Sequence, residues 1–267
     1  MTSVLGVDFS GASDAGRKIW VAEGAQTEDG ALALTRCVPA VDLPGGGLAP
    51  EIAVPALARY IAQTKDARVG CDFPFGLPRD LVTARSWRSF ALRYAAEFAN
   101  AESFRTIMRA RHDAIEHKRM TDRIAGTPFN SYNLRLYRQT WWGITGVVDP
   151  LVRANRAIVR PQQKLSVGKS VLLEVCAACT LKSIDLYPPY KGRDPQHRRA
   201  RSRILDFLID RGRLVAPTRR LRSLLLDNEG GDALDAVIGA VAAARADLAK
   251  EPDPYQRVEG RVYYEIG

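Results

Sequence analysis

Two short apolar segments, far apart in the chain, each end in one aspartate, and this pattern restricts the fold more than any other feature. The first segment, Val4 to Phe9, contains Asp8, and the second, Arg68 to Phe73, contains Asp72. Both are short, apolar and bounded by turn residues, as strands of a sheet are. A carboxylate at the exit of an apolar strand is costly unless something binds it. Each aspartate could instead cap the turn that follows its strand.

The order of expected elements predicts an α/β protein with a mixed sheet. The five expected strands cover residues 4–9, 18–23, 31–38, 68–73 and 170–176. Short Gly and Asp turns separate the first three strands, which predicts an antiparallel meander. A helix over 51–63 precedes the fourth strand, and this begins a crossover connection, so the last two strands are expected to be parallel.

The remaining segments are expected to be mostly helical. Residues 79–165, rich in arginine and aromatic residues, are predicted to be a helical insertion in a single domain spanning 1–267. His112 and His117, which flank Asp113 and Glu116, lack the spacing of a zinc protease, so we expect them on the surface of an amphipathic helix. An alanine-rich helix is expected over 231–248, and a hairpin-like segment over 256–266.

Two aspartates open the last long helix. Asp232 and Asp235 are three residues apart, which places both carboxylates on one face of the first helical turn. Asp232 could be an N-cap and Asp235 a second helix-start acid, because the helix dipole favours anions there. The apolar residues after Asp235 favour a position against the sheet. Glu174, at the end of the fifth strand, is a further candidate, and its alternative role is an ion pair with an arginine.

Together, the four aspartates predict an acidic centre that binds Mg²⁺ or Mn²⁺. Several carboxylates in one place repel each other, and a divalent cation with oxygen ligands removes that repulsion. Two such ions can activate a water and stabilise the leaving oxygen of a phosphodiester. The predicted metal ligands are Asp8, Asp72, Asp232 and Asp235, with Glu174 as a further catalytic candidate.

Positive charge is concentrated in residues 191–223. The whole chain carries a formal charge of +9, and this segment has eleven Lys and Arg against three Asp. Such a segment favours an anionic partner, of which nucleic acid is the commonest. The residues expected to contact phosphates are Lys191, Arg193, Arg198 and Arg199. The alternative is a solvated helix face whose apolar side, around Ile204 and Leu208, is buried. Aromatic residues that could stack bases are Tyr187, Tyr190, Trp141 and Trp142.

The cysteines and the N-terminus exclude several classes of protein. Cys176 and Cys179 form one C-x-x-C pair, and neither Cys37 nor Cys71 supplies a second pair for zinc, so we expect ordinary buried cysteines. The N-terminus has no signal-peptide pattern, and no apolar stretch approaches the length of a membrane span. We therefore expect a cytoplasmic protein without a membrane partner, and a homodimer is compatible with the sequence.

Five short motifs resemble those of a family of uncharacterised bacterial proteins that are described as predicted ribonuclease-H-like nucleases. The motifs are Gly6-Val7-Asp8-Phe9-Ser10-Gly11-Ala12, Asp72-Phe73-Pro74-Phe75-Gly76-Leu77-Pro78, Glu174-Val175-Cys176, Tyr190-Lys191 and Asp232-Ala233-Leu234-Asp235-Ala236. The order of strands and carboxylates is also similar to the ribonuclease-H-like superfamily, near its Holliday-junction-resolvase branch. The family pattern places a proline shortly after its glutamate, where this chain continues Val175-Cys176-Ala177.

The resemblance implies a ribonuclease-H-like fold and a metal-dependent nuclease that hydrolyses phosphodiester bonds in nucleic acid. Two other functions are open at this point. The segment from Gly6 to Gly11 looks like the first phosphate loop of the actin-like ATPases, which would make the protein an ATP-binding phosphotransferase, although no duplicated unit accompanies it. A nucleic-acid-binding protein without catalysis could also use this fold.

Overall fold

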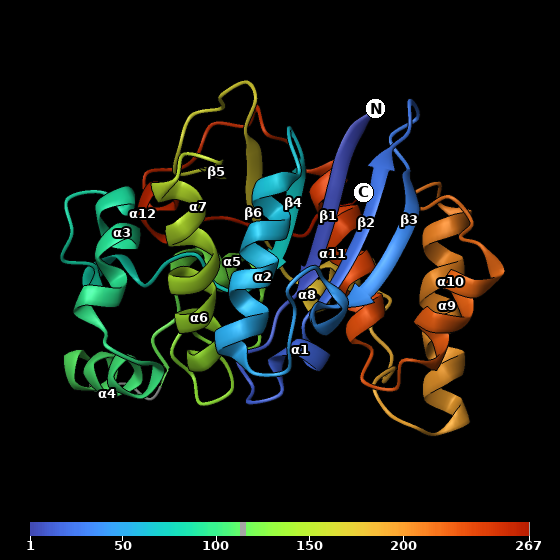
Figure 1. Cartoon of the computed structure of the whole chain (residues 1–267), viewed down its shortest axis with the longest axis horizontal. Coiled ribbons are helices and arrows are strands. Elements are labelled where there is room, and N and C mark those ends of the chain that lie inside the picture. Colours follow the sequence, from blue (N-terminus) through green and yellow to red (C-terminus); the bar gives the residue numbers. More distant parts are fainter. Residues whose placement is uncertain (113–115, 267) are drawn as a thin grey trace.

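Seven strands form one mixed sheet with helices on both faces (Figure 1). This computed structural model describes residues 1–112 and 116–266. The strands are β1 Thr2–Asp8, β2 Trp20–Gln26, β3 Leu32–Pro39, β4 Arg68–Asp72, β5 Ala157–Arg160, β6 Ser170–Val175 and β7 Val262–Tyr263. Their order is β3-β2-β1-β4-β6-β5, and β7 also pairs with β6. β1, β2 and β3 are antiparallel, and the other four strands run parallel to β1.

The helices differ widely in length. They are α1 Ala15–Lys18, α2 Pro50–Gln63, α3 Trp87–Glu97, α4 Ala101–Arg111, α5 Met120–Ala125, α6 Tyr137–Gly143, α7 Asp149–Arg153, α8 Ala177–Ser183, α9 Pro195–Asp210, α10 Arg219–Asp227, α11 Asp232–Arg245 and α12 Gln256–Glu259. A π-helical segment, Ile144–Val148, joins α6 to α7. Within the described residues, none of these helices has both the length and the apolar composition that a membrane crossing requires.

The predicted meander and the parallel return of β4 and β6 are confirmed, and three expectations need correction. The predicted helical insertion also contains β5, whose four residues are all buried. The segment 256–266 is not a hairpin, because β7 follows the short helix α12 and pairs in parallel with β6. His112 and His117 do not lie on a helix, since α4 ends at Arg111. Asp113 is outside the described residues.

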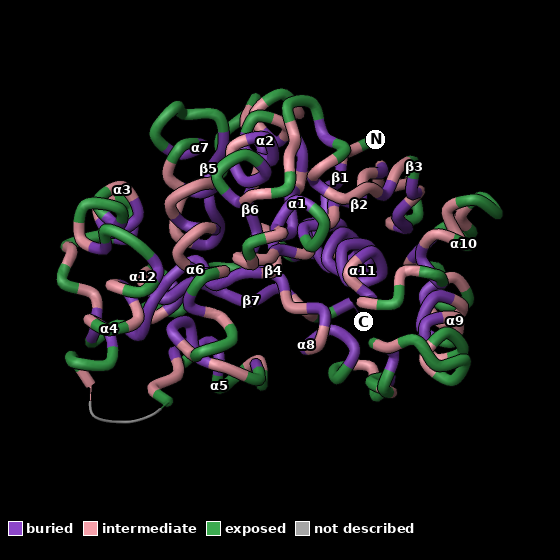
Figure 2. Tube along the Cα trace, turned by 60° about the horizontal axis from the view of Figure 1, so that its bottom comes forward, coloured by how far each residue is buried: buried purple, intermediate pink, exposed green. Residues whose placement is uncertain are grey.

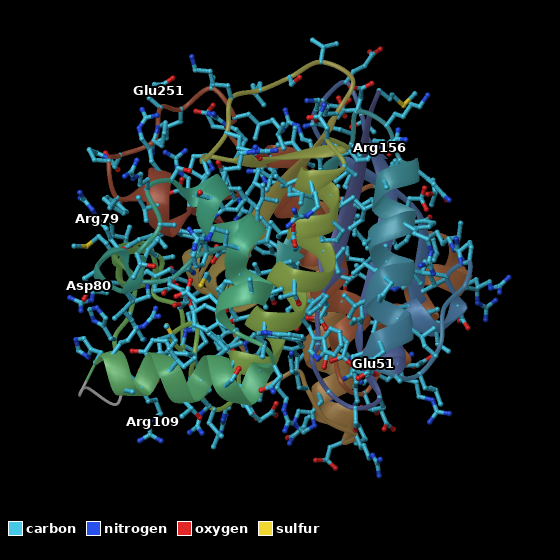
Figure 3. The ribbon with its side chains drawn as sticks, turned by 60° about the vertical axis from the view of Figure 1, so that its left-hand side comes forward. Glu51, Arg79, Asp80, Arg109, Arg156 and Glu251 are labelled. Atoms are coloured by element: carbon cyan, nitrogen blue, oxygen red, sulfur yellow. The ribbon has the colours of Figure 1, made fainter. Side chains whose placement is uncertain are left out.

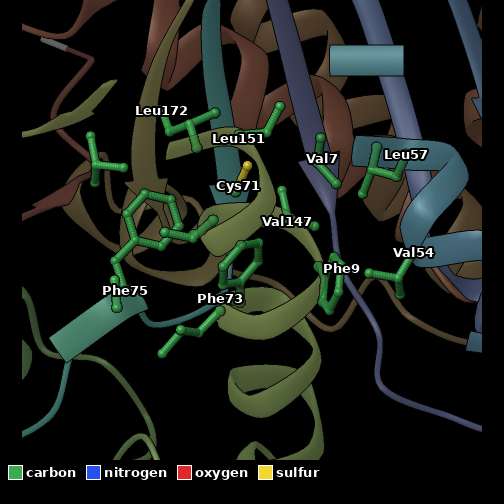
Figure 4. Packing of buried hydrophobic residues seen from close by; sticks show 14 of the residues in the cluster. Val7, Phe9, Val54, Leu57, Cys71, Phe73, Phe75, Val147, Leu151 and Leu172 are labelled. Carbon is green, nitrogen blue, oxygen red and sulfur yellow. The ribbon is translucent and has the colours of Figure 1, made fainter. Parts of the chain in front are cut away.

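The two faces of the sheet carry separate apolar cores. Leu5 and Val7 face a core that includes Val54 and Leu57 of α2, while Val4 joins the core beneath α11. Figure 4 shows Phe9 and Phe73, which follow β1 and β4, packed together in the first core with ring centroids 4.8 Å apart. Figure 2 shows that α11 is buried inside the molecule, whereas α9 and α10 keep an exposed outer side.

Two glycines let α11 lie directly on the sheet. Gly6 of β1 and Gly70 of β4 are register partners. A Cβ atom on Gly6 would lie 2.0 Å from the carbonyl oxygen of Ala236, and one on Gly70 would lie 2.6 Å from that of Gly239. Because residues two apart on a strand share a face, the side chains at positions 8 and 72 point to this same side. The start of α11 is therefore held close to the carboxyl ends of β1 and β4.

Candidate acidic centre

The four predicted aspartates line one pocket of about 360 Å³ at the carboxyl ends of the central strands. Asp8 and Asp72 are direct register partners of the parallel pair β1 and β4. Asp232 is the first residue of α11, and Asp235 follows one turn later and is 4% exposed. Gly231, with φ of 77°, holds the N-cap position of this helix, so Asp232 does not cap it.

The carboxylates raise one another's proton affinity. Burial, followed by repulsion from Asp235 and Asp72, raises the pKa of Asp8 well above its ordinary value. Burial and the nearby Asp235 raise the pKa of Asp72 to about 7. Burial also raises the pKa of Asp232 and that of Asp235. The pocket therefore favours protonated carboxylates or a compensating positive charge.

One positively charged side chain of the protein lies in this centre. The Nζ atom of Lys191 lies 2.6 Å from Oδ2 of Asp235, and the Tyr190 hydroxyl donates a 2.6 Å hydrogen bond to Oδ1 of the same carboxylate. Although burial acts to lower it, the pKa of Lys191 is raised by the carboxylates of Asp235 and Asp8. Lys191, predicted as a phosphate contact, is thus part of the acidic centre.

The aspartates share a pocket without forming a tight ligand set. Among the described residues, no three of these carboxylates bring oxygen atoms within 4.8 Å of one another. The ammonium of Lys191 provides the positive charge at Asp235 instead. A metal ion at Asp235 would therefore compete with Lys191 for the same oxygen.

Glu174 has the role that was the alternative to catalysis: it forms an ion pair with an arginine. Its carboxylate is buried and pairs with the buried guanidinium of Arg119, which also binds Asp122 at 2.7 Å. Oε2 of Glu174 accepts a 2.9 Å hydrogen bond from the backbone N–H of Phe75. Glu174 therefore fixes the turn that follows Asp72. It lines the pocket, but its charge is already compensated.

Sequence reasoning missed two residues of this pocket. Arg119 and Gln139 both lie in the predicted insertion, and the side-chain amide of Gln139 donates to the backbone carbonyl of Asp72. No local pattern marks the contacts of Arg119 with Glu174 and of Gln139 with Asp72, because both partners are more than 50 positions away in the chain. The spacing of Arg119 and Asp122 was the only usable signal, as an i, i+3 pair at a helix start.

The basic segment forms α9 and α10. Some of its arginine side chains are exposed to solvent, and one is buried and bonds to the backbone. Arg193 and Arg198 are exposed and pair with Glu229 at 3.0 Å and Asp227 at 2.8 Å. Arg199 is exposed as well. Arg201 is 2% exposed and donates to backbone carbonyls, including that of Tyr190 at 2.6 Å. The predicted apolar side of this helix is confirmed, because Ile204, Leu205 and Leu208 are buried.

The aromatic residues that were predicted to stack bases lie in different parts of the molecule. Tyr187 lines the acidic pocket and is 49% exposed, while Tyr190 is buried. Trp141 and Trp142 contact each other edge to face at 5.0 Å and line a separate hollow with Glu102. Tyr187 is thus the aromatic residue best placed to meet a ligand of the acidic centre.

The cysteines are mostly buried, as expected. Cys37, Cys71 and Cys179 are buried, whereas Cys176 is partly exposed and lines the acidic pocket. Cys176 stands directly after β6 and caps α8, where its sulfur accepts the N–H of Cys179 at 3.2 Å. This is the position of a redox C-x-x-C motif. However, the hydrogen bond with Cys179 and burial raise the pKa of Cys176, which disfavours a reactive thiolate.

Comparisons with known protein families, with curated proteins and with solved structures give no match for this chain. The inference about function therefore rests on the acidic pocket.

Proposed function

We propose that this protein is a divalent-metal-dependent nuclease with a ribonuclease-H-like fold, which hydrolyses phosphodiester bonds in nucleic acid. One observation carries the proposal: Asp8, Asp72 and Asp235, from three separate elements, line a single pocket at the carboxyl edge of the parallel strands. The order of an antiparallel β3-β2-β1 meander followed by parallel β4 and β6 agrees with that fold.

The donor set suits Mg²⁺ or Mn²⁺. The candidate ligands are all carboxylate oxygens, which hard divalent cations prefer. Their raised pKa values reflect charge that a cation would compensate. Asp8, Asp72 and Asp235 would hold the metal, and Asp232 would contribute from the rim. When bound, the metal would activate water and stabilise charge on the scissile phosphate.

The chain's own residues prepare the pocket for an anionic substrate. The Tyr190 hydroxyl orients the carboxylate of Asp235, and Arg119 and Glu174 hold the turn after Asp72. Lys191 is half-exposed, so its ammonium can turn from Asp235 toward a phosphate oxygen that enters the pocket. Tyr187 at the mouth offers a ring face for a base, because stacking on an aromatic ring accepts any base.

Cleavage of a panel of single-stranded, double-stranded and branched DNA and RNA, with Mg²⁺ or Mn²⁺, tests the proposal. We expect metal-dependent cleavage of at least one substrate, reduced by about 10²-fold or more in Asp8→Asn, Asp72→Asn and Asp235→Asn. Asp29→Asn is the matched control, since Asp29 is exposed in the turn between β2 and β3. The proposal fails if no substrate is cleaved and Asp8→Asn binds Mn²⁺ as well as the natural protein.

Two other results would redirect the assignment. Calorimetric binding of ATP without any cleavage would favour the actin-like phosphotransferase. Binding of nucleic acid without metal uptake would favour a non-catalytic binding protein on the same fold.

A further inference from the structure

A second group of metal-ligating side chains lies outside the acidic pocket. Asp80 belongs to the 3-10 turn Arg79–Leu81, His112 directly follows α4, and His117 precedes α5. One ligand atom from each of the three residues lies within 4.8 Å of the other two. In the described part of the chain, no other three His, Cys, Asp or Glu residues meet this condition. Figure 3 shows Asp80 at the edge of the molecule, close to Arg79.

The two histidine rings are held in a defined arrangement. The imidazoles of His112 and His117 stack with centroids 4.0 Å apart and planes 5° apart. Nε2 of His117 lies 2.8 Å from both carboxylate oxygens of Asp80. The side chain of His117 is 17% exposed and that of Asp80 is 59% exposed. The cluster thus combines a shielded imidazole with a carboxylate that is open to solvent.

The charged residues next to this cluster in the sequence contact other parts of the chain. Arg111 pairs with Glu97 at 2.8 Å, and the ammonium of Lys118 donates to the carbonyl of Thr127 at 2.8 Å. Glu116 accepts a 2.7 Å hydrogen bond from the side chain of Asn133. The Asp80 side chain is open to solvent, so its carboxylate can accept a metal ion.

The donor types distinguish this cluster from the acidic centre. Imidazole nitrogens suit zinc and related transition metals, whereas carboxylates alone suit magnesium and manganese. Two imidazoles and one carboxylate provide three ligands and leave a fourth position for water, once one of the stacked rings turns so that a nitrogen of each ring points at the ion. We propose that Asp80, His112 and His117 bind one Zn²⁺ ion. This proposal is independent of the nuclease activity.

The bound ion would join three segments of the chain. Asp80 follows the turn after β4, His112 directly follows α4, and His117 lies two residues before Arg119. Arg119 holds Glu174 in the wall of the acidic pocket. Zinc would therefore stabilise the segment that carries Arg119, because a ligand that binds only the folded state stabilises that state.

Calorimetric titration of the metal-free protein with Zn²⁺, together with thermal unfolding, tests this proposal. We expect one Zn²⁺ per chain and a higher Tm on zinc addition. His112→Ala, His117→Ala and Asp80→Asn should each weaken Zn²⁺ binding by at least about tenfold, since loss of even an outer-shell partner of a metal ligand costs this much. Asp80 is exposed, so Asp80→Asn should fold even if a histidine variant does not.

His197→Ala is the matched control. It removes the third histidine of the chain, which lies on α9 with its Nδ1 3.7 Å from the carboxylate of Asp194, and it should leave zinc binding unchanged. Asp72→Asn and the double variant Cys176→Ser/Cys179→Ser separate this site from the acidic centre and from the thiol pair. The proposal is overturned if the protein takes up no Zn²⁺, or if uptake persists in both Asp80→Asn and His117→Ala. Loss of uptake only in Asp72→Asn or the cysteine variant would also overturn it.

Discussion

At the scale of single residues, Lys191 has the most unexpected position. It was predicted to contact phosphates at the surface, yet its ammonium lies 2.6 Å from the Asp235 carboxylate. An ammonium and a metal ion at one carboxylate oxygen exclude each other through like-charge repulsion. Lys191 therefore compensates the charge of Asp235 and would compete with a metal ion in the proposed site, so a phosphate that draws the ammonium away would favour metal binding.

Replacing Lys191 with methionine should tighten Mn²⁺ binding by roughly three- to tenfold, because the competing charge is removed while the length of the side chain is kept. Mn²⁺ titration followed by calorimetry measures this change. Lys164→Met is the control, since Lys164 is exposed and is not among the residues that line this pocket. Weaker Mn²⁺ binding in the Lys191 variant would show that the lysine supports the metal rather than competing with it.

The pKa of Asp72 gives a second residue-scale prediction. Burial and Asp235 raise it to about 7, above the ordinary value near 3.8. The folded state therefore holds the proton more tightly than the unfolded chain, and the metal-free protein should lose stability as pH rises from about 4 to about 7. In the proposed site Mn²⁺ would bind the ionised form, so the metal should restore stability at pH 8 and have little effect at pH 5.

Urea unfolding of the metal-free protein at pH 5 and pH 8 measures this dependence. Asp72→Asn cannot ionise, so at pH 8 it should be more stable than the natural protein, by up to about 4 kcal/mol. The same variant should show a flatter pH dependence and no stabilisation by Mn²⁺. Equal stability of the two proteins at pH 8 would mean that Asp72 is not destabilised by its surroundings.

At the scale of elements, the contact between α11 and the sheet builds the centre. Gly6 and Gly70 bring the helix against β1 and β4, and the same register sets Asp235 beside Asp8 and Asp72. Gly6→Ala would place a methyl group against the backbone of Ala236, which cannot move without shifting the helix. We expect a loss of about 3 kcal/mol or more in urea unfolding, together with weaker Mn²⁺ binding.

Gly126→Ala is the control for that prediction. Gly126 has φ of 69°, and a Cβ atom added there would have no heavy atom within 4 Å, so alanine costs only the left-handed conformation, about 1 kcal/mol. An equal and small loss in both variants would show that α11 does not depend on close approach at Gly6.

The difference between local patterns and pairing of distant elements explains which features the sequence could predict. Asp8 and Asp72 were found because a carboxylate at the end of an apolar strand is visible locally, and the parallel return of β4 placed them side by side. β5 and β7 were missed because four and two residues carry too little periodicity, and both exist only through pairing with β6. The Arg119 pairing was missed because its partner is 55 positions away.

At the scale of the whole molecule, the distribution of charge sets how a polyanion would bind. The chain carries +9 overall, while the pocket at its centre is acidic. A nucleic acid would therefore be held by the outer basic surface and would meet the carboxylates only with metal present. The exposed arginines Arg193, Arg198 and Arg199 precede or begin α9, in the segment that starts at Lys191 beside the pocket.

Replacing all three of these arginines with glutamine should weaken binding to every nucleic-acid sequence alike, since phosphate contacts carry no sequence information. The slope of log K against log salt should become shallower by about one to three, because each lost phosphate contact removes up to about 0.9 for a duplex. Arg193 and Arg198 also pair with Glu229 and Asp227, which reduces their contribution to phosphate binding. Arg199 should therefore contribute most to the salt dependence. Fluorescence anisotropy at several salt concentrations measures the slope. Arg109→Gln/Arg156→Gln is the control, because Arg109 is exposed on α4 and Arg156 is exposed in the loop before β5. An unchanged slope in the triple variant would place the nucleic-acid surface elsewhere on the molecule.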